Sequence, residues 1–263
     1  MQVSFSEQRH FAQRASKAAG AALLATALAA TLAACGGGGG GDDDPLIAQG
    51  RYTTATGVSP AYTVLVVPAS AGAHQAWAVS STGDRLAKLN LSAANAVTGK
   101  RYNLSADPIT PETVTGTATL AGPASSASLT LPGLGALPAT TTVVSRTDRL
   151  TEAATLATVA RSWSGSFDAG LKTATWTISG AGVLSGSSTS GCTYTGNFVA
   201  RNDAPVFDVS FTQTCEGIPT DTVTIFSGVA RVSGSAGSTG LTVVAVSANE
   251  ETPWVSLFSP SAI

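Results

Sequence analysis

The chain of 263 residues carries 14 basic and 16 acidic side chains, which gives a formal net charge of −2 at pH 7. No block of basic residues lies beyond residue 34, so nucleic-acid binding, which depends on neutralising phosphates, is not expected. With two histidines and three cysteines in the whole chain, neither a metal site nor a cofactor site is expected.

Residues 1–34 have the features of an export signal. Basic residues as far as Lys17 precede an apolar run over residues 18–34, which is slightly short for a spanning helix and ends in small residues. Residues 32–35, Leu-Ala-Ala-Cys, resemble the lipobox of bacterial lipoprotein signal peptides. The resemblance implies that Cys35 receives a diacylglycerol, that the chain is cleaved before it, and that the new amino terminus is acylated with chains such as palmitate.

Residues 35–48 are expected to tether the lipidated end to the rest of the chain. Glycines over residues 36–41 are followed by three aspartates, a composition that cannot bury a core. By resemblance to the sorting rules of enteric bacteria, Gly36 in place of aspartate implies the outer membrane. We therefore expect an outer-membrane lipoprotein of the cell envelope, anchored by its acyl chains and facing the periplasm or the cell surface.

The chain from residue 49 onward predicts an all-β fold. Short runs of alternating apolar residues are separated by Gly, Pro, Asn and Asp, and they form two tandem units of roughly eight antiparallel strands each, residues 49–147 and 161–263. Sequential hairpins favour small up-and-down barrels, which leave no exposed edges; immunoglobulin-like sandwiches are the alternative. Residues 148–160 contain helix formers and neither Gly nor Pro, so they predict a short helix that joins the units.

The two units are predicted to be copies of one repeat. Residues 114–120 and 129–131 correspond without a gap to residues 226–232 and 241–243, each 112 positions further along the chain. In this alignment Gly116 falls on Gly228. Such self-similarity at a fixed period indicates a duplicated architecture.

The second unit weakly resembles the calycins, the group of lipocalins and avidins. Residues 163–167, Trp-Ser-Gly-Ser-Phe, resemble the first strand of that group, and residues 183–187 resemble an avidin hairpin. The resemblance implies a small barrel, but the ligand residues of the family are missing. The lipobox, glycine tether and tandem β units together resemble uncharacterised envelope lipoproteins of Gram-negative bacteria and, more distantly, the barrel domains of surface receptors such as transferrin-binding lipoproteins.

Two cysteines remain after Cys35 is assigned to the lipid, and in an oxidising compartment they predict a disulfide. Residues 192–200 and 207–215 can pair so that Cys192 faces Cys215 and the apolar side chains share one face. A slip of one residue would reverse this sorting, so the pattern specifies the register. We predict a hairpin joined at its open end by a bond worth about 3 kcal/mol.

No constellation in the sequence predicts an enzyme. A Ser-His-Asp triad would have to use His74, which is expected in a solvated loop, and the chain has no Gly-x-Ser-x-Gly elbow. The carboxylates that might act in pairs are expected on turns and polar strand faces: Glu112, Asp168, Asp208, Asp221, Glu250 and Glu251.

Aromatic side chains are the most suggestive feature of the second unit. Inside a barrel they either form ordinary core or line a cavity for a small apolar ligand. We expect a non-enzymatic envelope lipoprotein whose β units bind a small apolar ligand or another envelope component; the alternative is a structural or assembly accessory. The candidate lining residues are Trp163, Trp176, Tyr194, Phe198 and Phe211, with Trp77 and Trp254 as further candidates for a barrel cavity.

Overall fold

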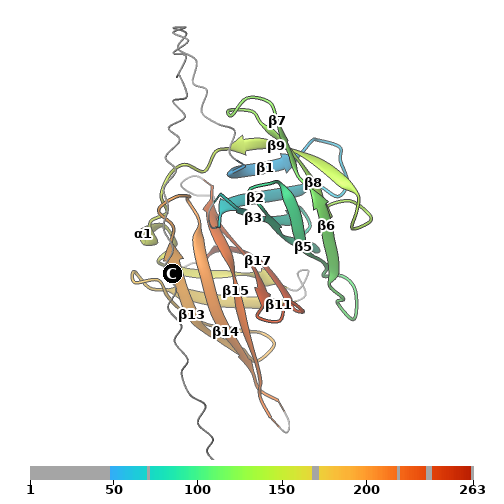
Figure 1. Ribbon diagram of the computed structural model, residues 1–263. Coiled ribbons are helices and arrows are strands. Elements are labelled where there is room, and N and C mark those ends of the chain that lie inside the picture. The colour runs from blue at the N-terminus through green and yellow to red at the C-terminus, as the bar shows by residue number, and fades with distance from the viewer. Residues whose placement is uncertain (1–47, 70–71, 168–171, 218–219, 235–238, 262–263) are drawn as a thin grey trace, which may run out of the picture. The chain divides into compact units, whose positions relative to one another are not determined.

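The computed structural model describes residues 48–69, 72–167, 172–217, 220–234 and 239–261 (Figure 1). The predicted signal peptide, Cys35 and the tether as far as residue 47 lie outside these ranges. The described chain is almost entirely β and forms two antiparallel barrels with one short helix between them. None of the helical structure in these ranges is long and apolar enough to cross a membrane.

The first barrel is built from a sheet of nine strands. Each strand pairs with the next in the chain, except at the break between β6 and β7, and β1 pairs with β9. The strands are β1 (Gly50–Thr54), β2 (Tyr62–Pro68), β3 (His74–Ser80), β4 (Arg85–Leu91), β5 (Ala96–Asn103), β6 (Glu112–Thr117), β7 (Thr119–Ala121), β8 (Ser128–Pro132) and β9 (Thr141–Asp148).

The seam of this barrel lies where β6 bends into β7. Only Ala118 separates the two strands, and β6 pairs with β5 while β7 pairs with β8. The buried Ala118 donates its N–H to the carbonyl of Asn95 at 2.8 Å. A Cβ on Gly133, whose φ is 84°, would lie 2.7 Å from the Val114 side chain, so glycine lets the end of β8 approach β6. With β6 and β7 counted as one bent strand, the barrel is nearly closed.

The second barrel is closed. Every strand pairs with its neighbours in sequence, and β10 closes the ring against β17, for example through Trp163 opposite Pro260. Up-and-down barrels are therefore confirmed over sandwiches. The strands are β10 (Ser162–Phe167), β11 (Lys172–Ile178), β12 (Val183–Ser188), β13 (Cys192–Ala200), β14 (Phe207–Cys215), β15 (Thr222–Ser233), β16 (Gly240–Ser247) and β17 (Pro253–Pro260).

The joining segment is less helical than its sequence predicts. Helix α1 covers only Leu156–Val159, whereas residues 148–160 were expected to be helical. Asp148 is taken by β9, where it pairs with Arg51. Leu150 is buried with a φ of 54°, a conformation that does not continue a right-handed helix. Strand pairing and burial therefore override local helix propensity over the first part of the segment.

Strand registers support the predicted duplication. Val97 lies opposite Gly116 in the first barrel, and the residues 112 positions later, Val209 and Gly228, lie opposite each other in the second. The next pair of strands keeps the same offset, since Thr119 faces Thr130 and Arg231 faces Thr242. The fifth, sixth and seventh strands of the two barrels, with β6 and β7 counted as one, thus share one register.

Three apolar clusters organise the described chain. One fills each barrel, and the third lies between their outer walls. Polar contacts cross the same interface: Lys88 Nζ lies 2.6 Å from Glu250 Oε1, and the Tyr102 hydroxyl donates to the Glu250 carbonyl at 2.9 Å. The interface cluster draws on both barrels and the segments beside them: Leu65, Val67, Trp77, Leu86, Tyr102, Leu104, Leu150, Ala204, Val206, Val229, Val244, Val246 and Val255.

Candidate ligand pocket between the barrels

The candidate lining residues of the second barrel do come together in its interior. Trp163, Trp176, Tyr194, Phe198 and Phe211 are each no more than 2% exposed. Trp176 lies among the others, with ring centroids 5.1 Å from Phe211 and 5.7 Å from Tyr194. Such tilted and edge-on contacts are those of a packed aromatic core.

Trp254 belongs to the same core. Its ring stacks on Trp176 at 5.9 Å and on Phe167 at 4.4 Å. The indole N–H groups of Trp176 and Trp254 are buried without a hydrogen-bond partner in the described structure, whereas Trp163 donates to the Val159 carbonyl at 2.8 Å. The interior of the second barrel is therefore occupied by rings that face one another.

His74 is not in a loop, as the sequence suggested. It is the first residue of β3, where it pairs with Pro68 and Leu91. The side chain is partly buried, and this burial lowers its pKa below the ordinary value. Pairing with β2 on one side and β4 on the other holds His74 in the strand.

The candidate carboxylates are distributed among separate contacts. Glu112 pairs with Arg101 at 2.7 Å, Asp208 with Arg201 at 3.1 Å, and Asp221 accepts the Gly217 N–H at 3.3 Å. Asp168 lies outside the described residues. Within the described ranges, no group of three or more His, Cys, Asp and Glu side chains is placed to hold a metal ion.

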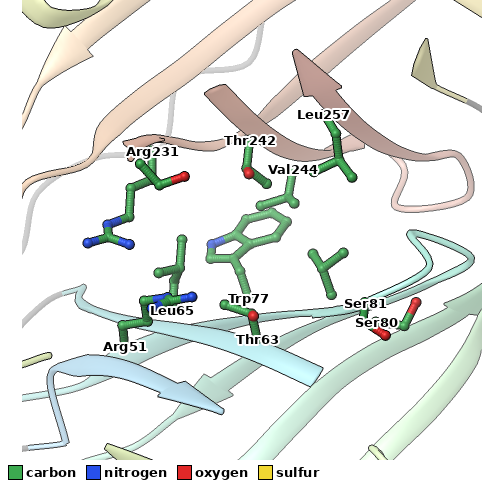
Figure 2. A pocket seen from close by; sticks show the side chains of 12 residues that line it. Arg51, Thr63, Leu65, Trp77, Ser80, Ser81, Arg231, Thr242, Val244 and Leu257 are labelled. Carbon is green, nitrogen blue, oxygen red and sulfur yellow. The ribbon is translucent and has the colours of Figure 1, made fainter. Parts of the chain in front are cut away.

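A pocket of about 180 Å³ lies between the outer walls of the two barrels (Figure 2). Strands β1, β2 and β3 of the first barrel form one wall, and β15, β16 and β17 of the second form the other. Its lining residues are Arg51, Thr63, Leu65, Trp77, Val79, Ser80, Ser81, Arg231, Ser233, Thr242, Val244 and Leu257.

Strand alternation explains why the apolar lining points outward. Ala76 and Ala78 belong to the interior cluster of the first barrel, so Trp77 between them faces the second barrel. Leu65 faces outward from β2 in the same way. The expectation that Trp77 lines a barrel cavity is therefore wrong: its side chain packs outside the barrel wall.

Trp77 forms the central wall of the pocket. Its side chain is 2% exposed, and its indole N–H donates to Gln75 Oε1 at 2.8 Å. The Lys88 ammonium lies 5.8 Å from the centroid of the indole. Figure 2 shows the ring standing in the space between the two walls, with Val244 on the opposite side. The indole therefore lies at the back of the pocket, with only a small part of its surface open to a ligand.

Two arginines mark one end of the pocket. Figure 2 shows the guanidinium groups of Arg51 and Arg231 on the same side of Trp77, with Ser80 and Ser81 on the other. Arg231 Nη2 lies 3.0 Å from Asp148 Oδ2, while its buried Nε has no hydrogen-bond partner among the described atoms. Burial lowers the pKa of Arg231, and the charge of Arg51 lowers it further. This end of the pocket is therefore electropositive.

Sequence reasoning missed the arginines and most of the apolar lining. One signal was available: β2 reads Tyr-Thr-Val-Leu-Val-Val-Pro, and β16 is similarly rich in consecutive apolar residues. A continuous apolar run indicates a strand that is buried on both faces. It could have predicted that these two strands carry an interface, but not which strands meet there.

Comparisons with protein-family models, with curated proteins and with solved structures found no match to this chain.

Proposed function

We propose that this protein is an envelope-anchored, non-enzymatic lipoprotein that binds a small, largely apolar ligand in the pocket between its two barrels. One observation carries the proposal: the pocket combines the apolar side chains of Leu65, Trp77 and Val244 with a polar end formed by two arginines. An apolar cavity with a few polar groups is the usual form of a small-molecule site.

The filled interior of the second barrel supports this choice of site. Its aromatic rings pack against one another, so a ligand there would have to displace core side chains. The pocket between the barrels uses residues that both walls already hold in place, because they belong to paired strands. A binding site on rigid elements needs little ordering when the ligand arrives.

The anchor in this proposal is the lipid on Cys35. The lipobox at residues 32–35 supports it, and each buried methylene of an acyl chain contributes about 0.8 kcal/mol to membrane binding. Several chains together would hold the protein at the outer membrane while the barrels face the aqueous side. Residues 35–48 would then connect the anchor to β1.

A structural or assembly role is the second candidate. The observation that favours it is a set of exposed apolar side chains on the outside of the second barrel. Val199 is 60% exposed on β13, and Val223 and Ile225 are 60% and 55% exposed on the same face of β15. Val223 and Ile225 are two positions apart on β15, and neighbouring exposed apolar groups are a feature of protein contact surfaces.

Native mass spectrometry distinguishes the two candidates. Residues 35–263 with Cys35→Ser would be exported to the periplasm, purified without detergent, and measured before and after denaturation. We expect an added mass that denaturation removes. The pocket variant Thr242→Trp should lose this mass, because a bulky side chain there fills the space beside Val244.

The matched control is Thr175→Trp, an exposed threonine on β11 that does not line the pocket. It should keep the added mass. If Thr242→Trp also kept it, the proposed location would be wrong. If the Cys35→Ser chain and both of its variants had only the mass of the polypeptide, ligand binding would be contradicted and the structural role favoured.

A further inference from the structure

We infer that the pocket between the barrels binds a small organic anion, with its carboxylate at Arg51 and Arg231 and its apolar body against Trp77. This inference rests on the proposed function and names the class of its ligand. Three observations support it: the charges of the two arginines, the Arg231 Nε donor that has no partner among the described atoms, and the small volume and apolar side chains of the rest of the pocket.

The charges near the pocket leave one positive charge uncompensated. Arg51 and Arg231 are the two titratable residues in the lining, and no acidic residue lines the pocket. The Asp148 carboxylate forms an ion pair with Arg231, and Asp148 lies opposite Arg51 in the β1–β9 ladder, so one acidic residue stands beside two arginines. Like charges this close repel each other, and a ligand with one negative charge would balance the site.

The guanidinium of Arg231 has a hydrogen-bond donor that the described part of the chain does not use. Its Nη2 contacts Asp148 at 3.0 Å, but its Nε is buried and has no partner in the described part of the chain. A guanidinium carries five N–H donors in a planar fork that matches a carboxylate. Because a buried donor without a partner is costly, an anion that accepts from this edge gains a charge-assisted hydrogen bond and relieves the cost.

The remaining lining favours an apolar body. Leu65, Trp77 and Val244 are nearly buried at the back of the pocket, whereas Val79 and Leu257 add more exposed apolar surface to the two walls. An inorganic anion such as phosphate would leave these surfaces without contacts. A flat or branched apolar group would cover this apolar surface and exclude water from it.

The volume limits the ligand to a small molecule. The pocket has a volume of about 180 Å³. It is below the range of roughly 300–1,000 Å³ that is typical of sites for drug-sized ligands. A carboxylate on a single ring or on a short branched chain fits within this volume.

A binding series on the soluble chain tests this inference. Residues 35–263 with Cys35→Ser would be titrated by calorimetry with sodium benzoate, benzyl alcohol and inorganic phosphate, after removal of any copurified ligand. We expect benzoate to bind at least tenfold more tightly than either of the others. Benzyl alcohol keeps the ring but lacks the charge, and phosphate keeps a charge but lacks the ring.

Arg51→Gln should weaken benzoate binding about tenfold or more, because hydrogen bonds to charged groups are worth roughly 1.5–3 kcal/mol. Arg51 is the better variant than Arg231, which also binds Asp148. Arg51→Lys should keep part of the affinity, since lysine supplies the positive charge but not the paired, planar donors of a guanidinium. Lys100→Gln removes a positive charge outside the pocket and should leave the affinity unchanged.

Three outcomes would overturn the inference. Equal affinity for benzoate and benzyl alcohol would show that the site does not select an anion. Unchanged binding in Arg51→Gln would show that the arginine end does not hold the carboxylate. An uncharged copurified ligand, displaced by Thr242→Trp, would refute the anion class while the proposed function stands.

Discussion

Cys192 lies directly opposite Cys215 in the β13–β14 ladder, and a disulfide joins their side chains. The bond lies at the open end of the hairpin, away from the turn between Ala200 and Phe207. It therefore adds a covalent link to the ladder at the end of the two strands that the turn does not join. The same register places Gly196 opposite Phe211 at the middle of the hairpin.

Removing this bond should destabilise the protein by about 3 kcal/mol, because it releases a loop with a sequence separation of 23 in the unfolded chain. The variant is Cys192→Ser with Cys215→Ser, which leaves no free thiol in the hairpin. Unfolding in urea, followed by tryptophan fluorescence, measures the loss. Reduction of the unsubstituted protein should give a similar loss, and a change within about 0.5 kcal/mol in both would contradict the stabilising role.

Gly196→Ala should be among the more damaging glycine substitutions, at roughly 1–3 kcal/mol. A Cβ at this position would lie 2.2 Å from the Ser210 carbonyl oxygen and 2.6 Å from the Phe211 side chain. The backbone atoms cannot move away without breaking the ladder. Thermal unfolding followed by circular dichroism measures the effect.

The control for this substitution is Gly180→Ala. A Cβ at Gly180 meets nothing within 4 Å, and its backbone is not in the left-handed region. Its melting temperature should stay close to that of the unsubstituted protein. Equal losses in the two variants would mean that the close approach of Phe211 is not the cause.

The β13–β14 hairpin could be predicted in detail because its two faces differ. Tyr194 and Phe198 are buried while Thr193 and Thr195 are exposed, so only one register keeps the apolar residues on one side. The cysteines added a second, independent constraint on the same register. Where two local signals agree in this way, the sequence specifies both the strand bounds and their pairing.

The pocket between the barrels could not be predicted because its signals are not local. Leu65 on β2 and Trp77 on β3 have buried apolar neighbours on the opposite face of their strands, and nothing in the nearby sequence says which side meets the second barrel. Arg51 and Arg231 look like ordinary outward-facing strand residues, yet they are 180 positions apart and line one pocket. Their meeting depends on how two barrels pack, which no periodicity encodes.

His74 should make the stability of the folded protein fall as the pH is lowered. Burial lowers its pKa in the folded state below the ordinary value of about 6.5. The unfolded chain therefore binds a proton first, and stability that is fully present above about pH 6.5 is lost as the pH falls toward the folded-state pKa. Urea unfolding of the protein lacking residues 1–34, at intervals between pH 7.5 and 5, measures this loss.

His74→Gln should flatten that pH dependence, because the only other histidine of the chain is His10 in the predicted signal peptide. The comparison is limited to pH values above 5 so that carboxylates contribute little. An unchanged slope in His74→Gln would show that another group causes the loss.

Lys88→Gln should weaken the contact between the barrels by about 0.5–1 kcal/mol, the range for a partly exposed ion pair. Lys88 Nζ lies 2.6 Å from Glu250 Oε1, with the two side chains 17% and 35% exposed. The loss should shrink at high salt, because exposed charges are screened. Lys100, at 4.0 Å from the same carboxylate, is the matched control and should lose less when changed to Gln.

Cys35→Ala should abolish membrane anchoring, if residues 32–35 act as the lipobox they resemble. Without a thiol at this position no diacylglycerol can be attached, and the several acyl chains that hold a lipoprotein are absent. Cells expressing the full chain would be labelled with radioactive palmitate and separated into membrane and soluble fractions. We expect label and membrane association in the unsubstituted protein and neither in Cys35→Ala, while Cys192→Ser with Cys215→Ser should keep both. Label retained by Cys35→Ala would contradict the assignment, because acylation would then occur at another residue.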